Sequence, residues 1–313
     1  MKRENRADAR AKKAEAKKRA ELAKKIKIAG IIAIPCLVII AMIAVAALSK
    51  KTYSLEINYI AGLDGEGKIV GIDVADYVDV CDYANIVIPK DEVAMTEEEL
   101  STHLDEVLSA LSVEELTDEI IAKNYGDVAS TVDEYIAYVK DEAQRSKVEN
   151  YLNEYILTNS TVTSYPKNYL KDVKKNTDNQ YILQFNYYNE MIASYTGSYP
   201  YTSYLEYYGA VYNAGKVEPG VTPPALTKKE YKNMVEETSK AIVKENLVFQ
   251  YIYEDLGLEI TNEDINEVIF SLGYEESSTG IDTCIADYGM PYLRQIAANY
   301  EVIDHLAETL PVQ

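Results

Sequence analysis

The stretch TKKEYKNMVEETSKAIVKENLVFQYIYEDLG, Thr227 to Gly257, decides the fold class of this chain. Thr227 followed three residues later by Glu230 is a capping box, the sequence signature of a helix start. Apolar residues then recur every three or four positions until Gly257, a common helix-ending residue. These apolar residues are Tyr231, Met234, Val235, Ile242, Val248, Phe249, Ile252 and Leu256. The stretch predicts one amphipathic helix about 40–45 Å long.

Similar signals predict further helices on both sides of this stretch. Capping boxes open at Thr96 and Thr131, Pro166 suits a first helical turn, and further starts follow at Thr261 and Pro291. Long helices with narrow apolar faces favour protruding antiparallel arms over one round core. We therefore predict a mainly α fold with long antiparallel helical arms.

The N-terminal part of the chain has a different composition. Residues 1–27 form a basic tail with 12 Lys or Arg against four Asp or Glu, and residues 28–48 carry no charged side chain. An apolar run of this length spans the hydrocarbon core of a bilayer, so we predict a transmembrane helix whose basic flank is cytoplasmic. A cleaved signal peptide is the alternative, because Ala44–Ala46 resembles a cleavage site. On the first interpretation, the protein crosses the cell membrane once and its body is extracytoplasmic.

The body beyond this segment is strongly acidic. Residues 52–313 hold 47 Asp or Glu and 17 Lys or Arg, a net charge of −30. This charge excludes general nucleic-acid binding and disfavours lying on an anionic bilayer. Within the body, alternating and β-branched segments predict a small β-rich juxtamembrane element at residues 49–95, and a helical domain at residues 96–313 follows it. The predicted strands are 53–59, 68–74 and 84–91.

The sequence lacks the residue patterns of known catalytic, cofactor and metal sites. Histidine occurs only at His103 and His305, and neither stands beside a recognisable nucleophile motif. We therefore predict no catalytic residue, no cofactor and no metal. Outside the apolar segment, Cys81 and Cys284 either form one disulfide or remain free, and their spacing favours neither.

Four segments, in order, resemble the C-terminal helical chaperone part of the trigger factor family, covering about residues 72–310. They are VADYVDVCDYANIVIPKDEVAMTEEELSTHLDEVL, LTDEIIAKNYGDVASTVDEYIAYVKDE, YILTNSTVTSYPKNYLKDVKK, and the long run from TKKEYKNM to NEDINEVI with the closing YLRQIAANYEVIDHL. The family's N-terminal ribosome-binding domain is replaced by the predicted anchor and β-rich element. Its peptidyl-prolyl isomerase domain is absent, because residues 113–131 run directly from one predicted helix to the next.

The resemblance implies a chaperone-like protein that binds unfolded or newly exported polypeptides without catalysis. The alternative is an anchored surface interaction or envelope-assembly protein with one specific partner. Peptide contacts are expected in a tyrosine-rich tip at residues 196–226, since tyrosine offers apolar area and tolerates water. Tyr187, Tyr188 and Tyr195 are assigned to the core, as are Tyr204, Leu205 and Tyr208 of a short helix that Thr202 or Ser203 caps and Gly209 ends. The candidate peptide-contacting residues are then Tyr199, Tyr201, Tyr207 and Tyr212.

Overall fold

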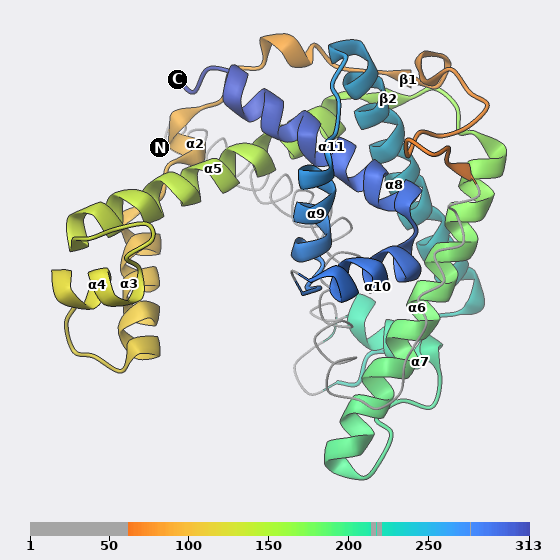
Figure 1. Cartoon of the computed structure of the whole chain (residues 1–313). Coiled ribbons are helices and arrows are strands. Elements are labelled where there is room, and N and C mark those ends of the chain that lie inside the picture. Colours follow the sequence, from red (N-terminus) through yellow and green to blue (C-terminus); the bar gives the residue numbers. More distant parts are fainter. Residues whose placement is uncertain (1–61, 214–216, 218–220, 276) are drawn as a thin grey trace, which may run out of the picture. The chain divides into compact units, whose positions relative to one another are not determined.

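The computed structural model describes residues 62–213, 217, 221–275 and 277–313. The basic tail, the predicted transmembrane segment 28–48 and the first predicted strand lie outside these residues. Among the helices of the described residues, none is both long and apolar enough to cross a membrane. The described residues are mainly helical (Figure 1), which confirms the predicted fold class at that level.

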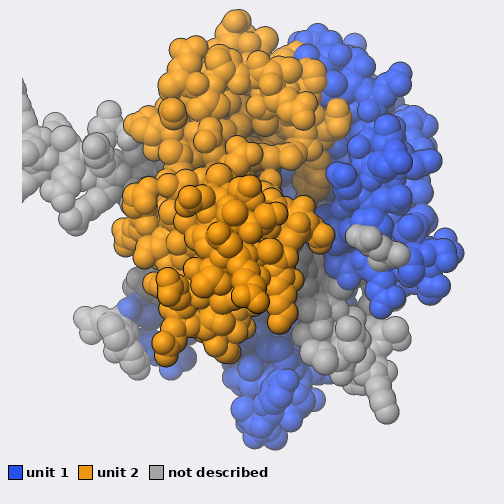
Figure 2. All heavy atoms as spheres, turned by 60° about the vertical axis from the view of Figure 1, so that its left-hand side comes forward, with its two compact units in different colours: residues 1–78, 162–299 blue, residues 79–161, 300–313 orange. Residues whose placement is uncertain are grey.

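The chain divides into two compact units, shown in different colours in Figure 2. Unit 1 comprises residues 1–78 and 162–299, and unit 2 comprises residues 79–161 and 300–313. Each unit therefore combines segments that lie far apart in the sequence. The predicted helical domain 96–313 is shared between the two units.

Unit 1 is built around a pair of long antiparallel helices, α6 and α8, which run side by side in Figure 1. Both begin where the sequence predicts: Pro166 is the N-cap of α6, and Thr227 and Glu230 form the capping box of α8. Capping boxes also form at Thr96, Thr131 and Thr261. The helices of unit 1 are α6 (Lys167–Thr196), α7 (Tyr204–Tyr212), α8 (Lys228–Leu256), α9 (Asn262–Ser271), α10 (Ser278–Tyr288) and the first half of α11 (Met290–Thr309).

The interface between α6 and α8 contains several buried polar side chains. Ser239 donates a hydrogen bond to Thr177 Oγ1 at 3.1 Å, and both residues are almost fully buried. Nearer the start of α6, the Tyr169 hydroxyl accepts a hydrogen bond from Asn246 Nδ2 at 3.0 Å. Gln295 of α11 makes a further bond to the same hydroxyl, so these buried polar groups satisfy one another.

Unit 2 consists of α2 (Lys90–Val93), α3 (Glu97–Leu111), α4 (Asp118–Asn124), α5 (Val132–Asn159) and the second half of α11. The chain end is paired with the segment before α2: Gln313 N donates to Ile88 O at 2.9 Å, and Lys90 N donates to Gln313 O at 2.8 Å. Ile88 is fully buried beneath this pairing. The extreme C-terminus is thus part of the packed structure of unit 2.

The described part of the predicted β-rich element, residues 62–95, contains little strand. Leu63 and Ile69 form one isolated bridge, and β1 (Val78–Asp79) pairs with β2 (Thr161–Val162). Short 3₁₀ helices, η2 (Val74–Asp76) and η3 (Tyr83–Asn85), occupy much of the remainder. Tertiary contacts replace strand pairing here, since Ile69 N donates to the side chain of Gln250 in α8. The strands predicted at 68–74 and 84–91 are therefore wrong as continuous elements.

Candidate functional site

An open groove of about 560 Å³ lies on unit 2, between α3, α5 and the loop that follows α4. Its volume falls within the range of protein sites that bind ligands. Apolar and aromatic side chains dominate its lining, with a few polar groups among them. The lining residues are Met95, His103, Asn124, Tyr125, Asp127, Val128, Tyr135, Tyr138, Val139, Glu142 and Ala143.

The floor of the groove belongs to the hydrophobic core of unit 2. Tyr135 and Val139, one turn apart on α5, are buried against Leu100, Val107 and Ile121. The rings of Tyr125 and Tyr135 have centroids 4.6 Å apart, and His103 Nε2 lies 3.2 Å from the Tyr135 hydroxyl, within hydrogen-bond distance. Burial raises the pKa of Tyr135 to about 12, so this phenol is neutral at physiological pH.

The rim of the groove presents apolar side chains to solvent. Val128 is 45% exposed and Tyr138 is 39% exposed. Asp127 and Glu142 also line the groove, and neither forms an ion pair within the described residues. The surrounding unit carries 23 Asp or Glu against five Lys or Arg. The groove is therefore an accessible apolar surface on a unit that its charge keeps soluble.

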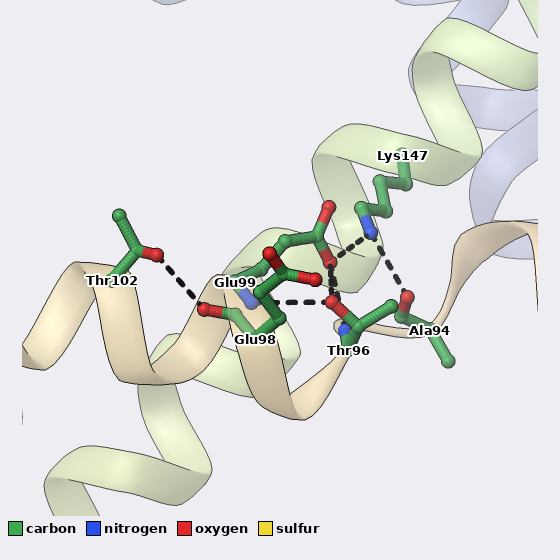
Figure 3. Close-up of polar contacts among 6 residues, drawn as sticks. All are labelled: Ala94, Thr96, Glu98, Glu99, Thr102 and Lys147. Carbon is green, nitrogen blue, oxygen red and sulfur yellow. Dashed lines mark hydrogen bonds and ion pairs between the residues drawn. The ribbon is translucent and has the colours of Figure 1, made fainter.

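A hydrogen-bond network holds the N-terminal end of α3 against α5 (Figure 3). Lys147 Nζ donates to Ala94 O at 2.9 Å and to Glu99 Oε2 at 2.7 Å, and Glu99 Oε2 also accepts from Thr96 N at 2.7 Å. The Lys147 bond, together with the bonds from Thr96, lowers the pKa of Glu99 to about 2. Because Ala94 and Thr96 are fixed on either side of Met95, the network positions this groove residue.

The loop that carries Val128 is also fixed at both ends. Asp118, in the first turn of α4, accepts a hydrogen bond from Val132 N at 2.9 Å. Glu134 accepts from Ser130 N at 2.8 Å, and Ala129 is buried in the core. The groove is therefore formed before any ligand arrives, which lowers the entropic cost of binding.

The tyrosine-rich segment of unit 1 forms mostly core. Tyr207 is 6% exposed, and its ring contacts those of Phe185, Tyr188, Tyr201 and Tyr208. Burial raises the pKa of Tyr207 to about 12. The rings of Tyr207 and Tyr201 are thus engaged within the protein, and we remove both residues from the candidate peptide-contacting set. The predicted core positions of Tyr188, Tyr204, Leu205 and Tyr208 are confirmed.

Two other predictions for this segment are wrong. Tyr195 is 82% exposed although we assigned it to the core, because α6 ends at Thr196 and no described element covers its last turn. Gly209 does not end α7, which continues to Tyr212. An added Cβ at Gly209 would lie 2.4 Å from Pro224 O, so glycine here permits close passage of the backbone at Pro224 and Ala225.

Of the four candidate tyrosines, Tyr199 and Tyr212 are exposed, at 65% and 49%. The groove on unit 2 was missed in the sequence. Its signal was present as three apolar residues outside the predicted helix stripes: Tyr125 and Val128 after the end of α4, and Tyr138 on α5. Single exposed apolar residues are common on protein surfaces, so this signal alone is weak.

The described residues contain no group of His, Cys, Asp and Glu side chains arranged to hold a metal ion. Cys81 and Cys284 are both free thiols, and burial raises the pKa of each. Comparison of the whole chain with protein-family models, with the curated proteins and with the solved structures gives no match.

Proposed function

We propose that the protein is a membrane-anchored, extracytoplasmic, chaperone-like protein that binds unfolded or newly exported polypeptides at the groove of unit 2. The observation that carries this proposal is the preformed, open groove with an apolar and aromatic lining. Such a surface accepts apolar side chains of many sequences, because hydrophobic contact is not directional. The likeness to the trigger factor family, which stands on the sequence segments alone, agrees with this function.

The proposed function needs no catalytic group. A shallow groove covers only a few side chains of an unfolded segment, so each contact is weak and the segment dissociates without a fuel molecule. The acidic charge of unit 2 keeps the protein soluble while the groove is open to solvent. Attachment to the membrane raises the effective concentration of the groove near polypeptides that emerge there.

Aggregation suppression by the full-length protein in lipid nanodiscs tests the proposal. The client is a reduced and alkylated protein that cannot refold. We expect suppression at stoichiometric amounts, and about tenfold weaker client affinity when V128S and Y138S are combined, equivalent to roughly 1.4 kcal/mol of lost apolar contact. The matched control is Y155S, since Tyr155 lies on the same helix, is 37% exposed and does not line the groove.

Two results would contradict this function. Equal loss of affinity in the control and in the groove variant would show that the groove is not the binding surface. No suppression, together with recovery of one tight partner, would favour the anchored interaction or envelope-assembly protein. Proline-limited refolding of a test protein should proceed at an unchanged rate, because the proposal includes no isomerase.

A further inference from the structure

The free end of α6 is a second exposed surface, on unit 1. From here on, the tip means residues 191–203, which overlap the start of the tyrosine-rich segment 196–226. Every residue from Ser194 to Pro200 is exposed, and the most accessible large side chains are those of Tyr195 and Tyr199, at 82% and 65%. A ligand bound here is not enclosed by the described residues. The tip is therefore suited to a broad, flat partner.

The tip differs from the rest of the chain in charge. The 15 residues from Met191 to Leu205 contain no charged side chain, whereas 26% of all residues are charged. The next residue, Glu206, directs its carboxylate to Thr202 N and Thr202 Oγ1, at 2.8 and 2.7 Å. The tip is thus an uncharged aromatic surface on a strongly acidic protein.

The backbone of the tip is held in one conformation by side-chain hydrogen bonds. Asn189 Nδ2 donates to Tyr201 O at 2.7 Å, and Asn189 Oδ1 accepts from Tyr201 N at 3.1 Å. Gly197 adopts a φ of 75° at the helix end, a conformation that favours glycine. Tyr195 and Tyr199 are therefore displayed by an ordered turn, so that contact through their rings costs little backbone entropy.

The length of the chain permits the tip to reach the bilayer of the predicted anchor. Gly62, where the described residues begin, lies beside Tyr169 near the start of α6. From Tyr169 to Tyr195 the helix is about 39 Å long at 1.5 Å per residue. The 13 residues between the predicted transmembrane segment and Gly62 span at most about 43–47 Å. This reach exceeds the length of the arm, so both ends of α6 can approach one membrane.

We propose that the tip contacts the interfacial region of a lipid bilayer through Tyr195 and Tyr199. Tyrosine is favoured at the boundary between headgroups and hydrocarbon, because its ring is apolar and its hydroxyl remains hydrated. The acidic surface elsewhere is repelled by anionic headgroups, whereas the uncharged tip is not. This contact is separate from the groove: it rests on the membrane anchor of the proposed function but not on client binding.

Photocross-linking of the full-length protein tests the proposal. Benzoylphenylalanine replaces Tyr195, Tyr199 or the control Tyr155 in protein held in phosphatidylcholine nanodiscs, and lipid adducts are counted by mass spectrometry. We expect adducts to be several-fold more abundant at positions 195 and 199 than at position 155. Replacing half of the lipid with phosphatidylglycerol should decrease adduct formation at the tip, because the acidic body is then repelled.

Other outcomes overturn the proposal. Absence of lipid adducts at both tip positions excludes bilayer contact. Equal adducts at position 155 indicate that the whole body lies on the membrane without selection by the tip. If an added unfolded client replaces lipid as the cross-linked species at positions 195 and 199, the tip is a polypeptide surface instead.

Discussion

Lys147 of α5 lies 2.7 Å from Glu99 of α3, although 48 residues separate them in the sequence. Lys147 Nζ also donates a hydrogen bond to Ala94 O, so one side chain of α5 is bonded to both the capping box of α3 and the residue before Met95. Replacing Lys147 by methionine keeps its apolar stem and removes both bonds. We expect the client affinity to fall severalfold while the fold is retained, because Met95 is no longer held in place.

The control for this variant is K140M. Among the described residues Lys140 forms one ion pair, with Glu97 at 3.0 Å, and the two side chains are 42% and 83% exposed. Exposed pairs of this kind contribute roughly 0–1 kcal/mol, so K140M should leave both affinity and stability nearly unchanged. Binding titrations at low and high salt distinguish the two variants. Equal effects from both would exclude a positioning role for Lys147.

Tyr135 offers a test of the groove floor that separates its ring from its hydroxyl. Y135F removes only the hydroxyl, with its contacts to His103 and Tyr125, and should cost about 1 kcal/mol of stability. Y135A also removes the buried ring and should cost about 3–5 kcal/mol. Denaturant unfolding measures both values. Similar costs for the two variants would contradict the packed floor.

Two tyrosines of unit 1, Tyr207 and Tyr199, should differ in their contribution to stability. Y207A should decrease stability by about 3–5 kcal/mol, because it empties a buried site among aromatic rings. Y199A should change stability by less than about 0.5 kcal/mol, as expected at an exposed site. Thermal unfolding with a nanodisc-embedded protein gives the comparison. A large loss from Y199A would show that its ring is packed.

The raised pKa of Glu245 predicts that the stability of the protein depends on pH. Burial raises this pKa from 4.5 to about 7. Between these pH values the folded state binds more protons than the unfolded state, so stability falls as pH rises through this window and is constant above it. E245Q should remove this dependence and stabilise the protein at pH 8 by on the order of 1–3 kcal/mol. Unfolding curves from pH 4 to 8 measure the difference, and parallel curves for both proteins would contradict the assignment.

Local signals were sufficient to predict most of the helices. The capping boxes at Thr96, Thr131 and Thr227 depend on residues three positions apart, and the structure confirms each of them. Long-range packing was not accessible in the same way. Gly209 has the appearance of a helix end in the sequence, but its role depends on Pro224, which approaches it from another part of the chain.

The candidate site could not be predicted from the sequence, because it too depends on long-range packing. A tyrosine on a helix is exposed or buried according to what covers it, and the sequence does not say that Phe185 and Tyr188 cover Tyr207 whereas the end of α6 leaves Tyr195 open. The groove depends on three separate segments that meet in unit 2. None of these segments carries a known binding motif, so the sequence alone does not predict the groove.

The polar contacts between α6 and α8 have a mechanical consequence. If one helix slid along the other by a single turn, Asn246 would lose Tyr169 and Ser239 would lose Thr177, each inside the protein. Ser239 and Thr177 would keep their bonds to the carbonyls of Val235 and Val173 in their own helices. The buried bond between Asn246 and Tyr169 would be lost at a cost of about 1 kcal/mol or more, a penalty that a leucine interface would not impose. The helix pair therefore has one preferred alignment. The distance between its two ends stays constant when a force acts on either of them.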